Sequence, residues 1–131
     1  MEEALLAYLQ ADAPLTVLLT GKIFWTQKPQ NVSNPVLLLT RISGTRDMQM
    51  LGPSGLVESR VQFDCDGLTY GSAKGVARAL RDRLSGFKGL QGTMTFHGCF
   101  LEAERDTFDE AITIDKLYRT SLDFMIWHKE N

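Results

Sequence analysis

Hydrophobic residues recur at helical spacing near the N-terminus of this chain. Met1, Leu5 and Leu9 fall on one helical face. The Asp-Ala-Pro sequence at 12–14 then predicts a break and a new helix start, since proline is tolerated in the first turn of a helix. Residues 15–19 form a short apolar stretch, so we expect two successive helices before the first strand.

A longer helical stripe lies in the middle of the chain. Ser72 is the predicted N-cap of this helix, and Gly86 is predicted to end it. The stripe consists of apolar residues at helical spacing: Ala73, Val76, Ala77, Leu80 and Leu84. This pattern is typical of an amphipathic helix packed on a core.

Alternation of apolar and polar residues predicts strands. It is cleanest over residues 56–66, where one face is apolar and the other is wet or interfacial. Residues 35–43, 93–104 and 117–128 are also predicted strands. We therefore expect one α+β domain over residues 1–131, with a mixed, largely antiparallel sheet of about four strands and two or three helices packed on one face.

The connections between the predicted strands are uneven in length. Residues 44–55 include the turn-forming sequence Gly-Pro-Ser-Gly and are predicted to be a long loop, a feature often linked to function. Arg46, Met48, Met50 and Leu51 lie in this loop. Methionine adapts to irregular surfaces, so these residues are candidate anchors that would become ordered on docking. Residues 105–116 form a second, polar connection.

Composition excludes several classes of protein. A formal net charge of −2 argues against a protein that coats nucleic acid, and two cysteines are too few for a disulfide-rich scaffold. The longest apolar run, residues 36–39, is far shorter than the ~20 residues of a membrane span. The acidic N-terminus does not resemble an export signal, so we expect an intracellular domain without a membrane anchor.

Candidate catalytic and metal-binding groups are few. A metal site would have to combine His97, Cys99, Cys65 and His128, and none of these has zinc-ligand spacing, although His97 and Cys99 are expected to share a strand face. Buried thiols and edge or interface histidines explain these residues better. Ser54 lies in a turn sequence without a nucleophile motif. We therefore predict neither an enzyme nor a cofactor.

Two oppositely charged segments are hidden in the near-neutral total. Residues 74–88 hold one acid and five bases, namely Lys74, Arg78, Arg81, Arg83 and Lys88. Residues 102–115 hold one arginine and six acids, namely Glu102, Glu104, Asp106, Asp109, Glu110 and Asp115. Both segments are consistent with solvated surface or with complementary surfaces for self-association or docking. The basic helix 72–86 also leaves open a small nucleic-acid-binding module.

The order of several sequence strings resembles the phage tail-completion, or tail-terminator, family. Residues 56–66 (LVESRVQFDCD), followed by Thr69-Tyr70 and the helix 73–84, resemble the central signature of that family. Residues 18–24 (LLTGKIF) are similar to its opening segment. Residues 34–42 (NPVLLLTRI) resemble the first strand of the family, and residues 118–128 (YRTSLDFMIWH) resemble its terminal strand. The resemblance therefore runs over nearly the whole chain, although residues 105–116 are unusually acidic.

The resemblance implies a structural protein of a phage, prophage or tail-like particle. Such proteins cap the head-proximal end of the tail tube as a ring, commonly a hexamer, and join it to the head connector or stopper protein. DNA only passes through the lumen, and the acidic segment is a candidate lumen surface. The implied location is the virion tail, after assembly in the cytoplasm of a bacterial host. The candidate ring or docking residues are Arg46, Met48, Met50, Leu51, Lys74, Arg78, Arg81, Glu102, Glu104, Asp106, Asp109 and Glu110.

Overall fold

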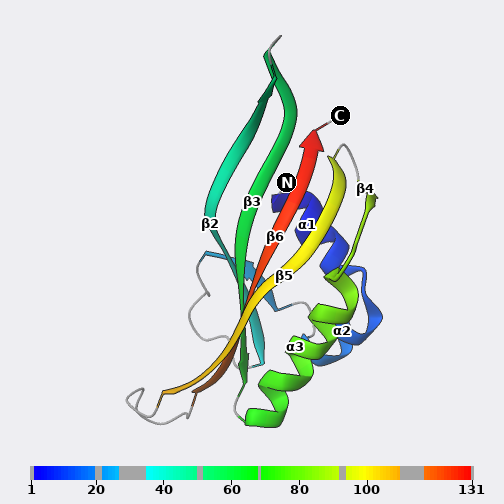
Figure 1. The fold of residues 1–131 in the computed structure, drawn as a ribbon. Helices are drawn as coiled ribbons and strands as arrows, with labels where there is room; N and C mark the ends of the chain where they lie inside the picture. Colours follow the sequence, from blue (N-terminus) through cyan, green and yellow to red (C-terminus); the bar gives the residue numbers. More distant parts are fainter. Residues whose placement is uncertain are drawn as a thin grey trace.

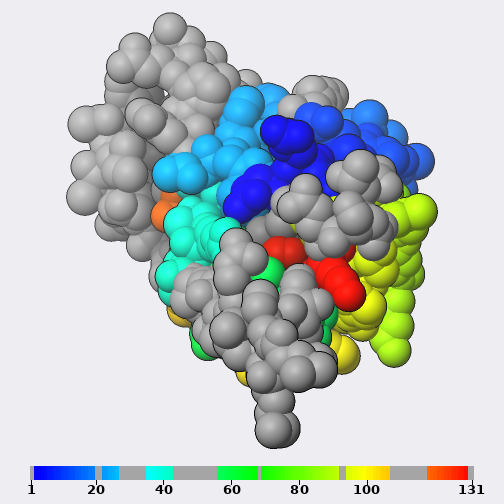
Figure 2. All heavy atoms as spheres, turned by 90° about the horizontal axis from the view of Figure 1, so that it is seen from above, coloured from blue at the N-terminus to red at the C-terminus, as the bar shows by residue number. Residues whose placement is uncertain are grey.

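Helices cover one face of a curled sheet in the computed structural model of this chain, which describes residues 2–19, 22–26, 35–49, 52–67, 69–91, 94–109 and 117–130 (Figure 1). Within these residues the helices are α1 (Glu2–Gln10), α2 (Ala13–Leu19) and α3 (Tyr70–Leu84). The strands are β1 (Ile23–Trp25), β2 (Val36–Gln49), β3 (Gly52–Gly67), β4 (Gly89–Gln91), β5 (Met94–Asp109) and β6 (Leu117–Glu130). Figure 2, seen from above, shows the N-terminal helices in blue along one side of the strands.

The predicted α+β class is confirmed, with a larger sheet than expected. The described residues form a six-stranded sheet in the order β1-β2-β3-β6-β5-β4, and its pairs are antiparallel except β1 with β2. The additional strands are β1 and β4, each of three residues. A segment this short shows no periodicity, so the sequence pattern could not identify it.

The predicted loop 44–55 is wrong for residues 44–49 and 52–55, and residues 50 and 51 lie outside the described part of the chain. Strands β2 and β3 pair on both sides of an irregularity between Arg46 and Met48, with Gly44 opposite Ser59 before it and Gln49 opposite Gly52 after it. Residues 52–55 carry turn-forming residue types and yet belong to β3, in a part of the strand that extends past its pairing with β6. A proline is tolerated there, since its missing N–H is not required by a second neighbouring strand.

Residues 105–109 are a second correction. They were expected to belong to a polar connection, and they instead continue β5, with Arg105 opposite Ser121 and Asp109 opposite Leu117. Successive residues of a strand alternate between two faces, and no helix of the described chain packs on one face of this sheet. A polar composition is therefore compatible with a strand here.

Helix α3 begins earlier than the sequence predicted. Thr69, rather than Ser72, is the N-cap residue, and its hydroxyl oxygen accepts a hydrogen bond from the Ser72 backbone N–H at 3.0 Å. A threonine or a serine satisfies an unpaired backbone donor of the first turn equally well, so residue type alone did not discriminate. At the other end, Gly86 adopts a φ of 75°, a conformation that glycine accepts without strain.

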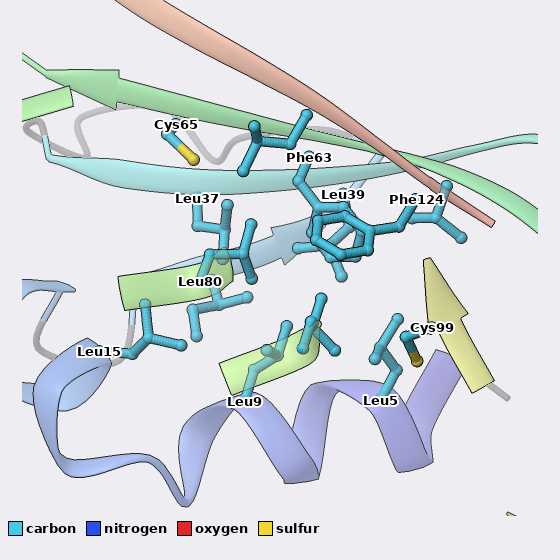
Figure 3. Packing of buried hydrophobic residues seen from close by; sticks show 14 of the residues in the cluster. Leu5, Leu9, Leu15, Leu37, Leu39, Phe63, Cys65, Leu80, Cys99 and Phe124 are labelled. Atoms are coloured by element: carbon cyan, nitrogen blue, oxygen red, sulfur yellow. The ribbon is translucent and has the colours of Figure 1, made fainter. Parts of the chain in front are cut away.

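The hydrophobic core lies between the helices and the covered face of the sheet. Figure 3 shows the leucines of α1 pointing toward the sheet residues. Phe63 of β3 meets Phe124 of β6 edge to face, with ring centroids 5.5 Å apart. Every leucine buried here stabilises the fold by roughly 1.5 to 3 kcal/mol. Buried members from the helices and strands include Leu5, Leu9, Leu15, Leu19, Leu37, Leu39, Phe63, Leu80, Leu84, Leu122 and Phe124.

Both cysteines and one of the two histidines are buried in the structure, and the other histidine is exposed. Cys65 and Cys99 are buried in the core, as predicted. His128 is not at an edge or interface, because it is buried on β6 and its ring Nε2 lies 2.8 Å from the Ser59 hydroxyl. His97 is exposed at a bulge of β5, whereas Cys99 is buried. The bulge shifts the alternation of side chains, so these two residues do not share a face.

Candidate assembly surfaces

Ion pairs within the subunit join helix α3 to strand β5. Lys74 Nζ lies 3.3 Å from Glu104 and 2.9 Å from Asp106, and Arg81 lies 3.6 Å from Glu104. The hydrogen bond from Lys74 lowers the pKa of the Asp106 carboxyl, and the same bond raises the pKa of Lys74. Part of the basic segment therefore neutralises part of the acidic segment within one chain.

The remaining charges of α3 are arranged in two ways. Arg83 donates to the Tyr8 backbone oxygen at 3.0 Å, and its guanidinium stacks 3.8 Å from the centroid of the Tyr8 ring. Arg78 is exposed and makes no ion pair with the residues that the structure describes. A helix that binds nucleic acid needs unneutralised cations, so these in-chain contacts weaken the nucleic-acid interpretation.

The opposite face of the sheet carries a polar network, which we call the open-face network. No helix of the described chain packs on this face (Figure 1). Asp64 accepts hydrogen bonds from Ser121 at 2.7 Å and from Gln62 at 3.0 Å. The members of the network are Arg60, Gln62, Asp64, Asp66, Arg105, Arg119, Ser121 and Asp123.

Arginine–carboxylate contacts connect the strands of this network. Arg119 of β6 donates two hydrogen bonds to the Asp66 carboxylate of β3, at 2.7 and 3.0 Å. Arg60 and Arg105 approach the same oxygen of Asp123, at 3.2 and 3.1 Å. The other carboxylate oxygen of Asp123 is buried and has no hydrogen-bond partner in the described part of the chain. Each of these carboxylates accepts charged hydrogen bonds from arginine, so the open face is highly polar along this part of the sheet.

The open face becomes apolar toward the C-terminal end of β6. Phe100, which is 49% exposed, lies opposite Met125 on the neighbouring strand. Its ring covers Gly98, because a Cβ built on that glycine would lie 2.7 Å from a ring carbon. Trp127, opposite Gly98, is partly buried. A polar region and an exposed aromatic region therefore adjoin on one surface, a combination found at protein interfaces.

The candidate interface residues are only partly visible in this structure. Arg46, Met48 and Asp109 lie on strands, but their side chains are outside the described part of the chain. Met50, Leu51 and Glu110 are entirely outside it. Glu102 is exposed at a bulge of β5 and makes no ion pair with the described residues. The sequence predicted a wet or interfacial face for residues 56–66, but it did not show that this face pairs with β5 and β6 as a network.

The described residues offer little for catalysis. They contain no group of three or more side chains suited to a metal ion. Burial raises the pKa of the Cys99 thiol to about 12, and burial next to Asp66 and Asp64 raises the pKa of Cys65 further.

No helix among the described residues has the length and apolar character to cross a membrane. A surface pocket of about 270 Å³ beside α3 is lined by Tyr8, Asp12, Pro14, Ala79, Asp82 and Arg83.

Comparison with known proteins identifies the class and then the family. In the virion of a native gene transfer agent particle, one chain has a similar fold, with a TM-score of 0.73 and 19% sequence identity over 98% of this chain and 94% of that chain. The family model described as tail completion protein gp17 matches residues 3–129. The chain is therefore a structural phage tail protein and belongs to the tail completion protein gp17 family. No curated protein sequence matches it.

Proposed function

We propose that this chain caps the head-proximal end of the tail tube as a ring, stops tube polymerisation and joins the tube to the head connector or stopper protein. The observation that carries this proposal is the family match over residues 3–129, which leaves almost no part of the chain outside a tail completion domain. The proposed partners are other copies of the chain, the tail tube protein and the connector. DNA passes through the ring without a dedicated binding site.

The surfaces of the subunit support assembly rather than chemistry. A closed ring needs two different patches on each subunit, because every copy contacts one neighbour on each side. Lys74, Arg81, Glu104 and Asp106 already pair within the chain, so they serve mainly to hold α3 on the sheet. Arg78 and Glu102 are exposed charges that remain as proposed contacts between neighbours or with the tube.

Residues 102–115 have a second proposed role as a lumen surface. Acidic groups facing the lumen would repel the phosphates of passing DNA, since phosphate contacts dominate the affinity of proteins for DNA. The exposed carboxylate of Glu102 fits either position. Reversing the charge at Glu102 separates the two roles, because a lumen role predicts slower DNA passage while a neighbour contact predicts weaker rings.

Polymerisation of the tail tube protein tests the capping function. Tubes are grown with and without the purified chain, and their lengths and ends are examined by negative-stain electron microscopy. We expect shorter tubes with a ring on one end when the chain is present. An unrelated acidic protein of similar size is the control. Tubes that grow to the same length without terminal rings would contradict the proposal.

A further inference from the structure

Among the described residues, two backbone edges of the long strands have no neighbouring strand. Strand β1 pairs with residues 37–39 of β2, and β4 pairs with residues 94–96 of β5. Within the part of the chain that the structure describes, no strand pairs with the outer edges of residues 40–49 or 97–109. Unpaired strand edges are templates for adding another strand.

These uncovered edges lie at diagonally opposite corners of the sheet. Phe96, which β4 covers, lies level with His128, Val57 and Arg46 across the sheet. Strand β2 is therefore open at the height where β5 is covered. Figure 1 shows the same offset, with the β2–β3 hairpin extending at the top and the β5–β6 hairpin at the bottom. Pairing along the full length of both edges therefore requires a stagger between two copies, and strands that close into a barrel are staggered.

Backbone hydrogen bonds define which residues of β2 face outward. The Leu37 N–H donates to Lys22 O, and Leu39 O accepts from the Thr26 N–H, so both residues turn their backbone toward β1. Outward and inward residues alternate along an antiparallel strand. Following the register past the bulge at Ile42, the next outward residues are Arg41, Gly44 and Arg46.

The same reasoning identifies the outward residues of β5. Cys99 O accepts from the Gly86 N–H, which lies on the outer side of this strand. Following the register past the bulge at Glu102, the next outward residues are Leu101, Glu104 and Asp106. Their backbone groups have no strand partner within the described residues. Among the described residues, each edge therefore presents backbone donors and acceptors without a strand partner, at the spacing of a β-ladder.

The strand directions are compatible with pairing between copies. Strands β2 and β5 run in opposite directions, because three antiparallel steps separate them in the sheet. When β2 of one copy lies beside β5 of the next, the antiparallel pattern continues. We place the C-terminal end of β2 of one copy beside Gly89, where β4 of the next copy begins. In this register Arg46, Gly44 and Arg41 of the first copy lie opposite Leu101, Glu104 and Asp106 of the second. Bulged residues on the two strands, at Ile42 and Glu102, keep these outward residues in step.

Charge favours pairing of unlike edges over pairing of like edges. The uncovered part of β2 carries Arg41, Arg46 and one acid, Asp47. The uncovered part of β5 carries one arginine and four acids, namely Glu102, Glu104, Asp106 and Asp109. Ion pairs within the chain neutralise part of both edges, because Lys74 contacts Glu104 and Asp106, Arg81 contacts Glu104, and Glu2 contacts Arg41. The sequence still gives the β5 edge an acidic excess and the β2 edge a basic excess, so two β5 edges repel each other and a β2 edge beside a β5 edge does not. The β2 edge of one copy is thus complementary in charge to the β5 edge of a second copy.

We infer that neighbouring copies of this chain join β2 to β5 and form a continuous, staggered sheet around the ring. The inference rests on the proposed ring function and names the interface that closes it. It uses two different edges of each subunit, which is the head-to-tail arrangement that a ring requires. The open-face network and the helix layer then lie on opposite surfaces of this continuous sheet.

Disulfide trapping tests the inference in the register given above. Thr45 and Ala103 become a directly opposed pair between copies, at a Cα separation of about 4.5 Å that a disulfide can bridge. We expect Thr45→Cys combined with Ala103→Cys, bound to tail tubes and oxidised, to give a ladder of linked multimers on a non-reducing gel. Ser43→Cys with Arg105→Cys is a second pair in the same register. Native Cys65 and Cys99 are buried and do not interfere.

Matched controls and electron microscopy separate this inference from the capping function. Single cysteine variants should give at most dimers, and Thr45→Cys with Arg78→Cys on the outer face of α3 should give no ladder. Rings on tube ends without a ladder from either double variant would overturn edge pairing and leave capping intact. A ladder without rings on tube ends would support edge pairing and overturn capping. Failure of both readouts would overturn both proposals.

Discussion

At the scale of single residues, the buried thiols give a direct test of the core. Burial raises the pKa of Cys99 from 9.0 to about 12, which reduces its thiolate about a thousandfold at neutral pH. Cys65 is equally inaccessible at 0% exposure. We expect neither thiol to react with iodoacetamide in the native protein, while both react in denaturant, as measured by mass spectrometry. Rapid native labelling of either thiol would show that the helix layer does not cover it.

The contact between Asp66 and Arg119 should be the strongest ion pair of the open face. Asp66 is buried and accepts two hydrogen bonds from the guanidinium, a geometry that strengthens such pairs. We expect a coupling free energy of about 1 to 2 kcal/mol from a double-mutant cycle with Asp66→Ala and Arg119→Ala, measured by urea unfolding.

Arg41 with Glu2 provides the matched control for that cycle. Both side chains are substantially exposed, at 40% and 45%, and their closest atoms are 3.4 Å apart. An exposed pair contributes at most about 1 kcal/mol. Equal coupling energies in the two cycles would show that burial and bidentate geometry add nothing on the open face.

At the scale of elements, the contact between α3 and β5 makes stability depend on pH. The hydrogen bond from Lys74 lowers the pKa of Asp106 below its ordinary value of 3.8. The Asp106 carboxylate therefore contributes to the free energy of unfolding above pH 3.8, and this contribution is lost as the pH falls through the lowered pKa. The pKa of Lys74 is raised above its ordinary value of 10.5. The charged lysine therefore stabilises the fold below pH 10.5, and this stabilisation is lost as the pH rises through the raised pKa. Neutral pH therefore keeps both contributions.

Asp106→Asn tests this contact between the two elements. We expect the variant to be less stable than the native chain at neutral pH by less than about 1 kcal/mol, because the carboxylate is 42% exposed and screened by solvent. The difference should disappear as the pH is lowered below the lowered pKa of Asp106, as followed by urea unfolding. Glu102→Gln, on the same strand and without an in-chain ion pair among the described residues, should show no such difference.

Long periodic elements were predictable from the sequence, whereas short ones were not. The alternation in β3 and the stripe of α3 depend on local spacing, and the structure confirms both faces. The sequence predicts a loop where β2 and β3 pair, because the turn-forming residues at 52 and 53 gain their strand conformation from a cross-strand partner. Tertiary pairing of this kind overrides local propensity.

The candidate surfaces show the same limit. Sequence reasoning found opposite charges on the helix and on the acidic segment, but it could not show that Lys74 reaches Asp106 across the fold. That contact depends on the bulge at Glu102, which turns Glu104 and Asp106 toward α3. A one-residue shift in β5 would direct the same side chains to the open face, so charge patterns alone do not separate in-chain pairs from interfaces.

At the scale of the whole molecule, a head-to-tail ring predicts an unusual dose response. Arg46→Pro removes an outward N–H from the β2 edge and leaves the β5 edge intact, and proline is tolerated on a strand edge whose N–H faces outward. A subunit with one blocked edge leaves any ring that contains it open. With equal amounts of variant and native chain, about one in 64 six-membered rings would lack the variant.

Mixing experiments with tail tubes measure this response. We expect capping to fall far below half when native chain is mixed with an equal amount of Arg46→Pro, as judged from tube lengths by electron microscopy. Arg46→Ala removes the same charge but keeps the backbone N–H, so it should interfere much less. If the two variants interfere equally, the side chain rather than the backbone edge carries the contact. A linear loss of capping with Arg46→Pro would mean that subunits act independently, which is incompatible with a ring closed through β2 and β5.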